Sequence, residues 1–265
     1  MIRKLLRRVF SGRSSHSAEP QVVPRSKHGV SSDGISSSAR RVISALQDKG
    51  FAAYVVGGAV RDLLLGLKPK DFDIATSATP EQVRSVFRRS RIIGRRFRLV
   101  HVMFGNDTVE VSTFRARQGN DPAEQVSDEH GRILSDNVFG NQEEDATRRD
   151  FTINALFYDP TSEEIHDFCG GLDDLKARRL RMIGDPEQRY REDPVRMLRA
   201  VRLAAKLGLK IEAGTRAPIK KLAPLLANVP SSRLFEEMMK LLMSGVTVKG
   251  ATPSEIIREL RGGRV

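Results

Sequence analysis

The sequence predicts an α/β domain followed by a helical domain. Strand-length apolar runs alternate with helical patterns over residues 36–173, whereas helical patterns take over from Asp174. The 265 residues are 39% hydrophobic and 29% charged, which is the composition of a folded globular protein. No apolar run approaches the ~20 residues of a membrane-spanning helix, so we expect no membrane partner. The one cysteine, Cys169, excludes a disulfide framework.

Positive charge is concentrated at the start of the chain. Lys and Arg total 45 against 33 acidic residues, a formal net charge of +12, and residues 1–30 hold a disproportionate share of that excess. We interpret residues 1–35 as a basic, disordered arm that contacts nucleic acid; the alternative is a mitochondrial transit peptide. The arm predicts a cytoplasmic protein and the transit peptide a mitochondrial one. Basic charge of this size favours a polyanionic partner, RNA or DNA rather than a membrane; the alternative is a surface that is only solubilising.

The first domain, residues 36–173, is predicted from apolar spacing and turn residues. Ala39, Val42, Ile43 and Leu46 form one helical face that ends at Gly50. The pattern then predicts these elements in order: strand 51–56, helix 59–65, strand 72–76, a helix to Phe87 opened by a capping box at Thr79–Gln82, strands 99–104 and 108–114, an apolar segment 152–158, and strand 164–168. Residues 115–136 are predicted to form a long loop.

The second domain, residues 174–245, is predicted to be helical. The helical patterns cover 174–177, 194–207, 217–226 and 232–243. In the second of these, Arg196 and Arg199 lie opposite a predicted apolar stripe made of Met197, Leu198, Val201, Ala204 and Ala205. The pattern gives no structure for the tail, residues 246–265.

A double glycine follows the first predicted strand. Gly57 and Gly58 stand between that strand and the next helix, and Arg61 lies on the first turn of the helix. Without side chains, the backbone can approach an anion at the helix N-terminus, where unpaired N–H groups and the helix dipole favour phosphate. The same dipeptide also forms ordinary tight turns, so both interpretations stay open.

Two aspartates, Asp71 and Asp73, are separated by one residue at the second predicted strand. Alternation puts both carboxylates on one face and Phe72 on the other. Carboxylates this close repel each other, and a divalent cation relieves the repulsion; oxygen ligands favour Mg²⁺. Glu110, on the non-core face of a later strand, is a third candidate ligand. The alternative for each is a solvated surface carboxylate.

Arginines recur in two further motifs. Arg148 and Arg149 open an apolar segment, and paired guanidinium groups suit the oxygens of a triphosphate. Asp193 precedes Arg196 and Arg199 on the polar side of the helix over 194–207. These three side chains either face a nucleobase, with the carboxylate accepting and the arginines donating or stacking, or form a solvated polar face.

The order of these motifs is typical of a known family. The sequence resembles the class II template-independent nucleotidyltransferases, which are the CCA-adding enzymes and bacterial poly(A) polymerases, in five successive motifs: Gly57–Asp62, Asp71–Asp73, Arg148–Ala155, Gly170–Leu175 and Glu192–Arg199. Three stretches are similar to the poly(A) polymerase branch: Gly94–Gly105, Asp136–Gly140 and Arg189–Asp193. The resemblance covers residues 36–243.

The resemblance implies a fold and a reaction. The fold is a five-stranded mixed sheet of the DNA polymerase β nucleotidyltransferase type, residues 36–173, joined to an all-helical neck, residues 174–245. The reaction is the addition of AMP from ATP to an RNA 3′ end. Two Mg²⁺ ions, or Mn²⁺ in their place, would be held by Asp71 and Asp73.

The resemblance also assigns roles to the remaining motif residues. Gly57 and Gly58, with Arg61 and Arg149, would hold the triphosphate. Asp150 would position the nucleotide sugar or support the metal site. The adenine would be faced by Asp193, Arg196 and Arg199.

Two alternatives to a poly(A) polymerase remain. Within the family, the alternative is a CCA-adding tRNA nucleotidyltransferase. In another class, it is a catalytically idle RNA-binding protein that keeps only the basic surface. The presence of Asp71, Asp73, Arg149 and Asp150 argues against the idle protein, because an inactive site has no use for like charges held close together.

Overall fold

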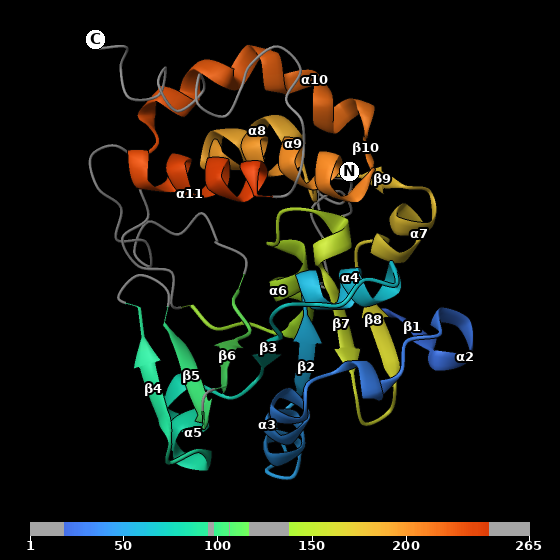
Figure 1. Ribbon diagram of the computed structural model, residues 1–265, viewed down its shortest axis with the longest axis vertical. Helices are drawn as coiled ribbons and strands as arrows, with labels where there is room; N and C mark the ends of the chain where they lie inside the picture. The colour runs from blue at the N-terminus through green and yellow to red at the C-terminus, as the bar shows by residue number, and fades with distance from the viewer. Residues whose placement is uncertain (1–18, 95–97, 106, 117–137, 244–265) are drawn as a thin grey trace, which may run out of the picture.

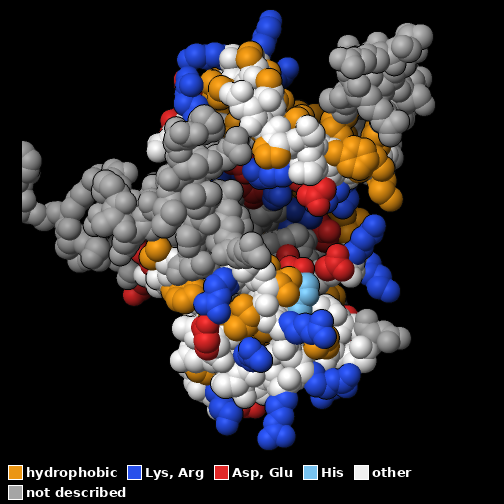
Figure 2. Space-filling view, turned by 90° about the vertical axis from the view of Figure 1, so that its left-hand side faces the viewer, with side chains coloured by type: hydrophobic (Ala, Val, Ile, Leu, Met, Phe, Trp, Pro, Cys, Tyr) orange, Lys and Arg blue, Asp and Glu red, His pale blue; other side chains and the backbone are white. Residues whose placement is uncertain are grey.

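The fold has a sheet domain below and a helical layer above. The computed structural model describes residues 19–94, 98–105, 107–116 and 138–243 (Figure 1). Figure 2 shows the two parts from the side of β4, with a hollow between them. The predictions for residues 1–18, for the loop over 117–136 and for the tail over 246–265 lie outside the described residues. In the described part of the chain, no helix has the length and apolar character needed to cross a membrane.

The sheet has eight strands, so the prediction of five is wrong. Its spatial order is β1-β8-β7-β2-β3-β6-β5-β4, and all neighbours are antiparallel except β3 and β6. The strands are β1 (Gln21–Pro24), β2 (Ala53–Val56), β3 (Asp73–Thr76), β4 (Ser90–Ile93), β5 (Leu99–Phe104), β6 (Asp107–Thr113), β7 (Leu156–Asp159) and β8 (Glu164–Asp167). The edge strands β1 and β4 were not predicted, and each is formed by pairing with a single neighbour, β8 and β5 respectively.

The N-terminal segment is folded where the structure describes it, which corrects the prediction of a disordered arm over 1–35. After β1 come α2 (Arg25–His28) and a 3₁₀ turn, η1 (Ser32–Gly34). β1 pairs with β8, and Glu163, the residue before β8, holds the other two elements. Arg25 pairs with the Glu163 carboxylate at 2.7 Å, and the Ser32 N–H donates to it at 2.8 Å. The hydrogen bond from Ser32 and the pairing with Arg25 lower the pKa of Glu163 to about 2.

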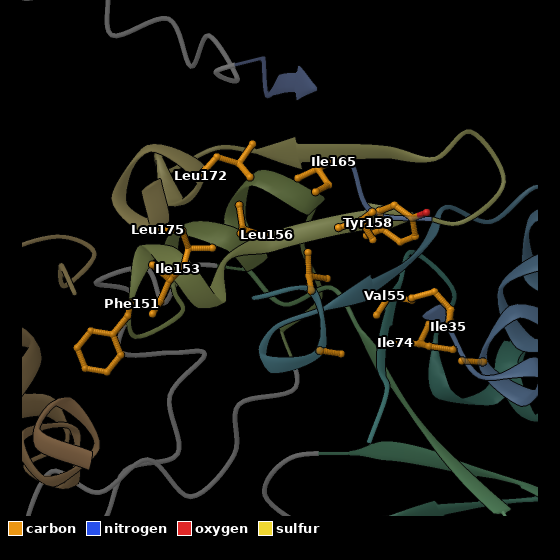
Figure 3. Close-up of a cluster of buried hydrophobic side chains, with 14 of the residues drawn as sticks. Ile35, Val55, Ile74, Phe151, Ile153, Leu156, Tyr158, Ile165, Leu172 and Leu175 are labelled. Atoms are coloured by element: carbon orange, nitrogen blue, oxygen red, sulfur yellow. The ribbon is translucent and has the colours of Figure 1, made fainter. Parts of the chain in front are cut away.

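The main core lies between one face of the sheet and two helices. These helices are α3 (Ser37–Gln47) and α5 (Pro80–Val86), and the predicted capping box of Thr79 and Gln82 begins α5. Figure 3 shows part of this core. Val55, Ile74 and Leu156 come from strands of the sheet, and Ile153 comes from the segment just before β7. A smaller apolar cluster on the other face of the sheet packs against α6 (Gln142–Thr147).

Short elements join the sheet to the helical layer. They are α4 (Gly58–Leu64), the 3₁₀ turn η2 (Thr152–Asn154) and α7 (Gly171–Lys176). The carboxylate of Asp167 accepts the N–H groups of residues 169–172 at 2.8–3.0 Å and so begins α7. The buried Asp174 on α7 holds Arg179 and Arg181, each at 2.7 Å.

The helical layer comprises α8 (Pro186–Glu192), α9 (Val195–Leu207), α10 (Ala213–Leu222), the 3₁₀ turn η3 (Ala223–Asn228) and α11 (Ser231–Leu242). The prediction that this part is all-helical is wrong, because β9 (Arg179–Leu180) and β10 (Lys210–Ile211) form a small parallel sheet. The predicted apolar stripe of α9 is also displaced. Val201 and Ala205 are exposed, and the buried row is Val195, Met197, Ala200, Leu203 and Leu207. Both rows are apolar, and packing against α8 and α11 selects the buried one.

Candidate functional site

A cleft of about 660 Å³ lies between the sheet domain and the helical layer. Nine basic side chains and five acidic ones line it, so its walls carry an excess of positive charge. Of the residues predicted from sequence, the lining includes Gly57, Gly58, Arg61, Asp73, Arg149, Asp150, Asp193, Arg196 and Arg199. Asp71 and Glu110 are not among the lining residues. Side chains separated by up to 142 positions in the chain therefore meet in one cleft, which opens on the hollow in Figure 2.

The carboxylates lie at the start of β3 and on the neighbouring β6. Asp73 is the first residue of β3, and the parallel register pairs it with Glu110. Asp71 precedes the strand and is exposed. The atoms around the carboxylate partly desolvate Asp73, which raises its pKa; repulsion from Glu110 and Asp71 raises it further, while Arg149 acts in the opposite direction. The register thus concentrates negative charge at one place on the sheet.

These carboxylates suit a divalent cation that is completed by its substrate. In the described part of the chain, no group of three or more His, Cys, Asp or Glu side chains is placed to hold a metal ion by itself, and this includes Asp71, Asp73 and Glu110. Mg²⁺ needs no such group, since it usually takes one or two protein carboxylates together with substrate phosphates. Desolvation and, after it, like charges raise the pKa of Asp73, and a bound cation relieves both, so the carboxylate of Asp73 fits Mg²⁺ or Mn²⁺.

The double glycine turns the chain sharply between β2 and α4. Gly57 has φ +73°, ψ −132°, a conformation that side chains rarely adopt. A Cβ on Gly57 would lie 3.6 Å from Nη1 of Arg149, and one on Gly58 would lie 3.3 Å from Nη2 of Arg61. The turn therefore brings bare backbone close to two guanidinium groups, as a phosphate-binding turn requires.

Arg61 is held inside the protein. It is buried, and its guanidinium donates to Asp62 at 2.6 Å and to Oδ1 of Asn154 at 2.6 Å. The amide of Asn154 in turn donates to Oδ1 of Asp150 at 3.0 Å. Arg61 therefore connects the glycine turn to Asp150 through Asn154.

Asp145 holds the arginine pair. Its carboxylate is almost completely buried and lies 3.0 Å from Arg148 and 2.7 Å from Arg149. Burial works to raise the pKa of Asp145, but the two arginines outweigh it and hold the pKa below its usual range. The Arg149 guanidinium also lies over the ring of Phe157, 5.2 Å from its centroid. Its direction into the cleft is thus fixed from two sides.

An ion pair between Asp150 and Arg199 joins the sheet domain to the helical layer. Nη2 of Arg199 lies 2.7 Å from Asp150, and Nη1 lies 3.6 Å from the buried Glu237 on α11. Although burial opposes the charged form, Arg199 together with hydrogen bonds from Asn154 and Phe151 lowers the pKa of Asp150 to about 2. Glu237 also pairs with Arg202 at 2.7 Å.

Asp193 and Arg196 are both in the cleft but do not pair with each other. Arg196 donates to Glu192 at 3.0 Å and to the carbonyl of Arg189 at 2.8 Å. Asp193 pairs instead with Arg233 of α11 at 2.9 Å. The simple solvated Asp–Arg pair considered for this helix is therefore not formed.

Several charged residues at the cleft were not predicted from the sequence. Arg189 lies behind the cleft wall: its guanidinium donates to the carbonyls of Arg148 at 2.5 Å and Arg149 at 2.6 Å, and pairs with Glu192 at 2.8 Å. The spacing of Asp145, three and four residues before the arginine pair, is a local signal that could have revealed its role. Asn154 stands in the Arg148–Ala155 motif, four residues after its partner Asp150. Nothing local in the sequence signals the contacts of Arg189 with the arginine pair, of Glu237 with Arg202 or of Arg233 with Asp193, because these partners come from distant elements.

Two family models match the chain. A poly A polymerase head domain matches residues 53–181, and a probable RNA and SrmB-binding site of polymerase A matches residues 208–252. Among curated relatives, "Poly(A) polymerase I" of Escherichia coli O157:H7 is 52% identical over 92% of this chain and 53% of its own length. "Poly(A) polymerase I" of Haemophilus influenzae is 51% identical over 87% and 52%, respectively. A Lactobacillus helveticus "CCA-adding enzyme" is 41% identical over 76% and 48%.

Solved structures give a consistent result. The CCA-adding enzyme of Bacillus stearothermophilus in complex with CTP aligns with a TM-score of 0.65 and 39% identity, covering 77% of this chain and 47% of that one. The Thermotoga maritima CCA-adding enzyme complexed with tRNA aligns with a TM-score of 0.66 and 25% identity, covering 91% and 54%. The chain spans about half the length of the curated relatives it matches.

Proposed function

Since the chain belongs to the bacterial poly(A) polymerases of the class II template-independent nucleotidyltransferase family, we propose that it adds AMP from ATP to RNA 3′ ends. The observation that carries the proposal is the cleft, in which Asp73, the arginine pair and the polar edge of α9 face one volume. Identity favours polyadenylation over CCA addition, with 52% to a poly(A) polymerase against 41% to a CCA-adding enzyme.

In this proposal, Asp71 and Asp73 hold the catalytic Mg²⁺ ions, with Glu110 as a further candidate ligand. When bound, the ions activate the RNA 3′-hydroxyl and stabilise the leaving pyrophosphate. The carboxylates must be ionised for this, and desolvation together with repulsion from Glu110 makes Asp73 harder to ionise than an isolated aspartate. Mn²⁺ has a similar preference for oxygen ligands and would serve in place of Mg²⁺.

The remaining cleft residues position the nucleotide. The backbone of Gly57 and Gly58 and the guanidinium of Arg149 would contact the triphosphate, because these groups lie together at the turn before α4. Arg61 lines the cleft beside that turn, and its hydrogen bond to Asn154 supports the turn from inside the protein. Asp150 would position the nucleotide sugar or support the metal site.

The adenine would be recognised on the helical layer. Asp193 and Arg196 lie on the cleft wall at the start of α9, and Arg199 lies one turn further. Asp193 can accept from the amino group of a base, and the guanidinium groups can donate to ring nitrogens or stack. The ion pairs of Asp193 with Arg233 and of Arg196 with Glu192 hold these groups before the nucleotide arrives.

We assign the head to residues 36–173, with the sheet extended by β1, and the neck to residues 174–245. The head is proposed to be of the DNA polymerase β nucleotidyltransferase type. The bacterial origin of the relatives favours the cytoplasm, and β1 argues against a transit peptide up to residue 35, because a removed leader would take an edge strand with it. RNA and ATP are the proposed partners, and no protein partner is proposed.

Nucleotide incorporation tests the proposal. The protein is incubated with a short RNA, Mg²⁺ and each of the four nucleotides separately, and product length is measured on a gel. A long ladder with ATP supports the proposal. Limited addition of CTP and then ATP to a tRNA lacking its 3′ end would identify a CCA-adding enzyme instead. RNA binding without any extension would identify a catalytically idle RNA-binding protein.

A further inference from the structure

A row of polar side chains crosses four neighbouring strands and begins at Asp73. The register pairs Asp73 of β3 with Glu110 of β6. It then pairs Glu110 with His101 of β5, and His101 with Arg91 of β4. Directly paired residues project from the same face of a sheet, so the row is continuous from the carboxylates to the sheet edge. The opposite face of these strands carries the buried valines that α3 and α5 cover. We call the outward side of β4, β5 and β6 the β4–β6 face.

The outer end of the β4–β6 face is basic and open. Arg91 is exposed, and so is Arg89, which lies two residues earlier and whose carbonyl continues the pairing by accepting from the Met103 N–H. Within the described ranges, neither guanidinium has an ion pair or a side-chain hydrogen bond. Figure 2 looks at this side of the molecule and shows Lys and Arg side chains spread over the sheet domain up to the hollow.

The inner part of the face is polar. Glu110 is about half exposed and lies 3.3 Å from Nε2 of His101, whose ring is partly exposed. Thr108 is exposed beside them. Among the described residues of β4–β6, Ile93 is the one large apolar side chain that is exposed, at 36%, and the half-buried Leu99 and Met103 flank His101 on the same face. A stable interface with a folded protein or a second copy needs a continuous apolar centre, whereas here the apolar side chains alternate with charged and polar ones.

We propose that the β4–β6 face carries the primer RNA upstream of its 3′ end as a single strand, with Arg89 and Arg91 contacting its phosphates. The inference rests on the proposed function, which places the 3′-hydroxyl at Asp71 and Asp73. Unpaired arginines are the complement of a phosphate backbone, and the partly exposed ring of His101 offers a base a stacking surface.

The spacing of the strands gives the number of nucleotides between the reacting 3′ end and Arg91. Strands in a sheet are about 4.8 Å apart, so the three steps from β3 to β4 span roughly 14 Å. At about 3.4 Å per phosphate of a stacked strand, Arg91 lies roughly four nucleotides from the reacting end. A trinucleotide primer therefore ends before the arginines, whereas a 12-nucleotide primer passes over them.

The test compares two double variants that each remove two positive charges. Arg89→Gln with Arg91→Gln alters the β4–β6 face. Arg40→Gln with Lys49→Gln is the matched control, because both residues are exposed on or just after α3, which covers the other face of the sheet. Thermal unfolding first checks that both variants fold like the wild type. Affinity for a fluorescent 12-nucleotide oligoadenylate is then measured over a salt series, and extension is measured with primers of 3 and 12 nucleotides.

The proposal predicts a length-dependent loss. The face variant should bind the 12-mer roughly three- to tenfold more weakly, with a log–log salt slope shallower by up to about 1.4 because two phosphates are no longer neutralised. It should extend the trinucleotide at the wild-type rate, and the control should match the wild type with both primers. An unchanged slope, or an equal loss in both double variants, overturns the proposal.

Photocrosslinking separates failure of this surface from failure of the proposed function. Oligoadenylates carrying one 4-thiouridine at the third to eighth position from the 3′ end are crosslinked to the wild-type protein, and the attached peptides are identified. The upstream positions should attach to the peptide that spans residues 88–104. If the RNA attaches to this peptide but the protein extends no primer, the proposed function is wrong and the RNA-binding surface stands. If the protein extends the primer but the RNA attaches only to the helical layer, the proposed function stands and the RNA-binding surface is wrong.

Discussion

Asp73 is exposed and has a raised pKa. We therefore expect its replacement to lower activity without lowering stability. Replacing Asp73 by Asn removes repulsion from Glu110 without opening a cavity. We expect AMP transfer to fall by at least about a hundredfold, because a metal ligand is removed. We expect the melting temperature to stay the same or to rise. Gel assays and calorimetry measure the two effects, and a stable variant that still extends RNA at the wild-type rate contradicts the assignment.

Arg199 differs from Asp73 because its removal leaves a buried charge behind. In Arg199→Met, Asp150 and Glu237 are deprived of a shared partner, so we expect a loss of about 2–3 kcal/mol in unfolding free energy. That range is below the usual cost of breaking a buried pair, since the Arg199 side chain is 36% exposed. Urea denaturation measures the loss. Arg216→Met, an exposed arginine on α10, serves as the control and should stay within about 0.5 kcal/mol of the wild type.

The same variant has a predicted pH dependence. In the wild type the pKa of Asp150 is about 2, below its unfolded value, so the stability it contributes is present above the unfolded pKa and is lost as pH falls toward 2. Without Arg199 only the hydrogen bonds from Asn154 and Phe151 oppose the desolvation of Asp150, so its pKa is higher in the variant than in the wild type. The stability difference between wild type and variant should therefore shrink from pH 7 to pH 3. A difference that stays constant over this range means that Asp150 is not the group left unpaired.

At the scale of elements, Arg189 ties α8 to the segment that carries the arginine pair. It is a positioning residue, since it contacts the carbonyls of Arg148 and Arg149 and not the proposed nucleotide. We expect Arg189→Met to lower kcat/KM for ATP by roughly ten- to a hundredfold, the equivalent of about 1.5–3 kcal/mol for the removal of charged hydrogen bonds.

A neighbour on the same helix provides the control for Arg189. Arg191→Met removes an exposed arginine that pairs with Glu187, and it should keep kcat/KM within about twofold. Arg189→Lys keeps the charge but not the planar fork, so it should restore only part of the activity. If Arg189→Met changes the melting temperature but neither KM nor kcat, the residue holds the fold without positioning the nucleotide site.

Local patterns predicted elements well where an element's own residues decide it. The capping box of α5 and the buried face of α3 belong to this class, and both were predicted with bounds close to those observed. The missed strands β1 and β4 exist because β8 and β5 pair with them. The site divides in the same way: Asp73 and Arg149 stand in compact motifs, whereas the contacts that give Arg189 and Glu237 their place at the site join them to partners 35 or more positions away. Local spacing cannot encode those distances.

At the scale of the whole molecule, the N-terminal segment has two parts with different expected roles. Deleting residues 1–18 removes five Lys and Arg residues and leaves β1 in place. Deleting residues 1–35 also removes β1 and the buried side chains of Val23, Val30 and Ile35. We expect the longer deletion to destabilise the protein by at least about 3 kcal/mol, while the shorter one leaves the melting temperature unchanged.

RNA affinity should respond to the shorter deletion if residues 1–18 bind RNA. Each phosphate that the protein no longer neutralises lowers the log–log salt slope by roughly 0.7 for a single strand. Filter binding of the two deletion proteins over a salt series measures this. A slope equal to that of the full chain would mean that these residues do not bind RNA, and a longer deletion that melts like the shorter one would contradict the role given to β1.

The strand order also determines when each strand can pair with its neighbours during synthesis. β7 and β8 separate β1 from β2 in the sheet, yet they are synthesised about a hundred residues after β2. At roughly 5–20 residues per second, a ribosome needs on the order of 5–20 seconds to supply them. Until then one edge of β2 stays unpaired and β1 has no partner, and such edges invite pairing with other chains. The nascent protein therefore passes through an interval of seconds in which a sheet edge is open to pairing with other chains, and the interval ends when β7 and β8 pair with β2 and β1.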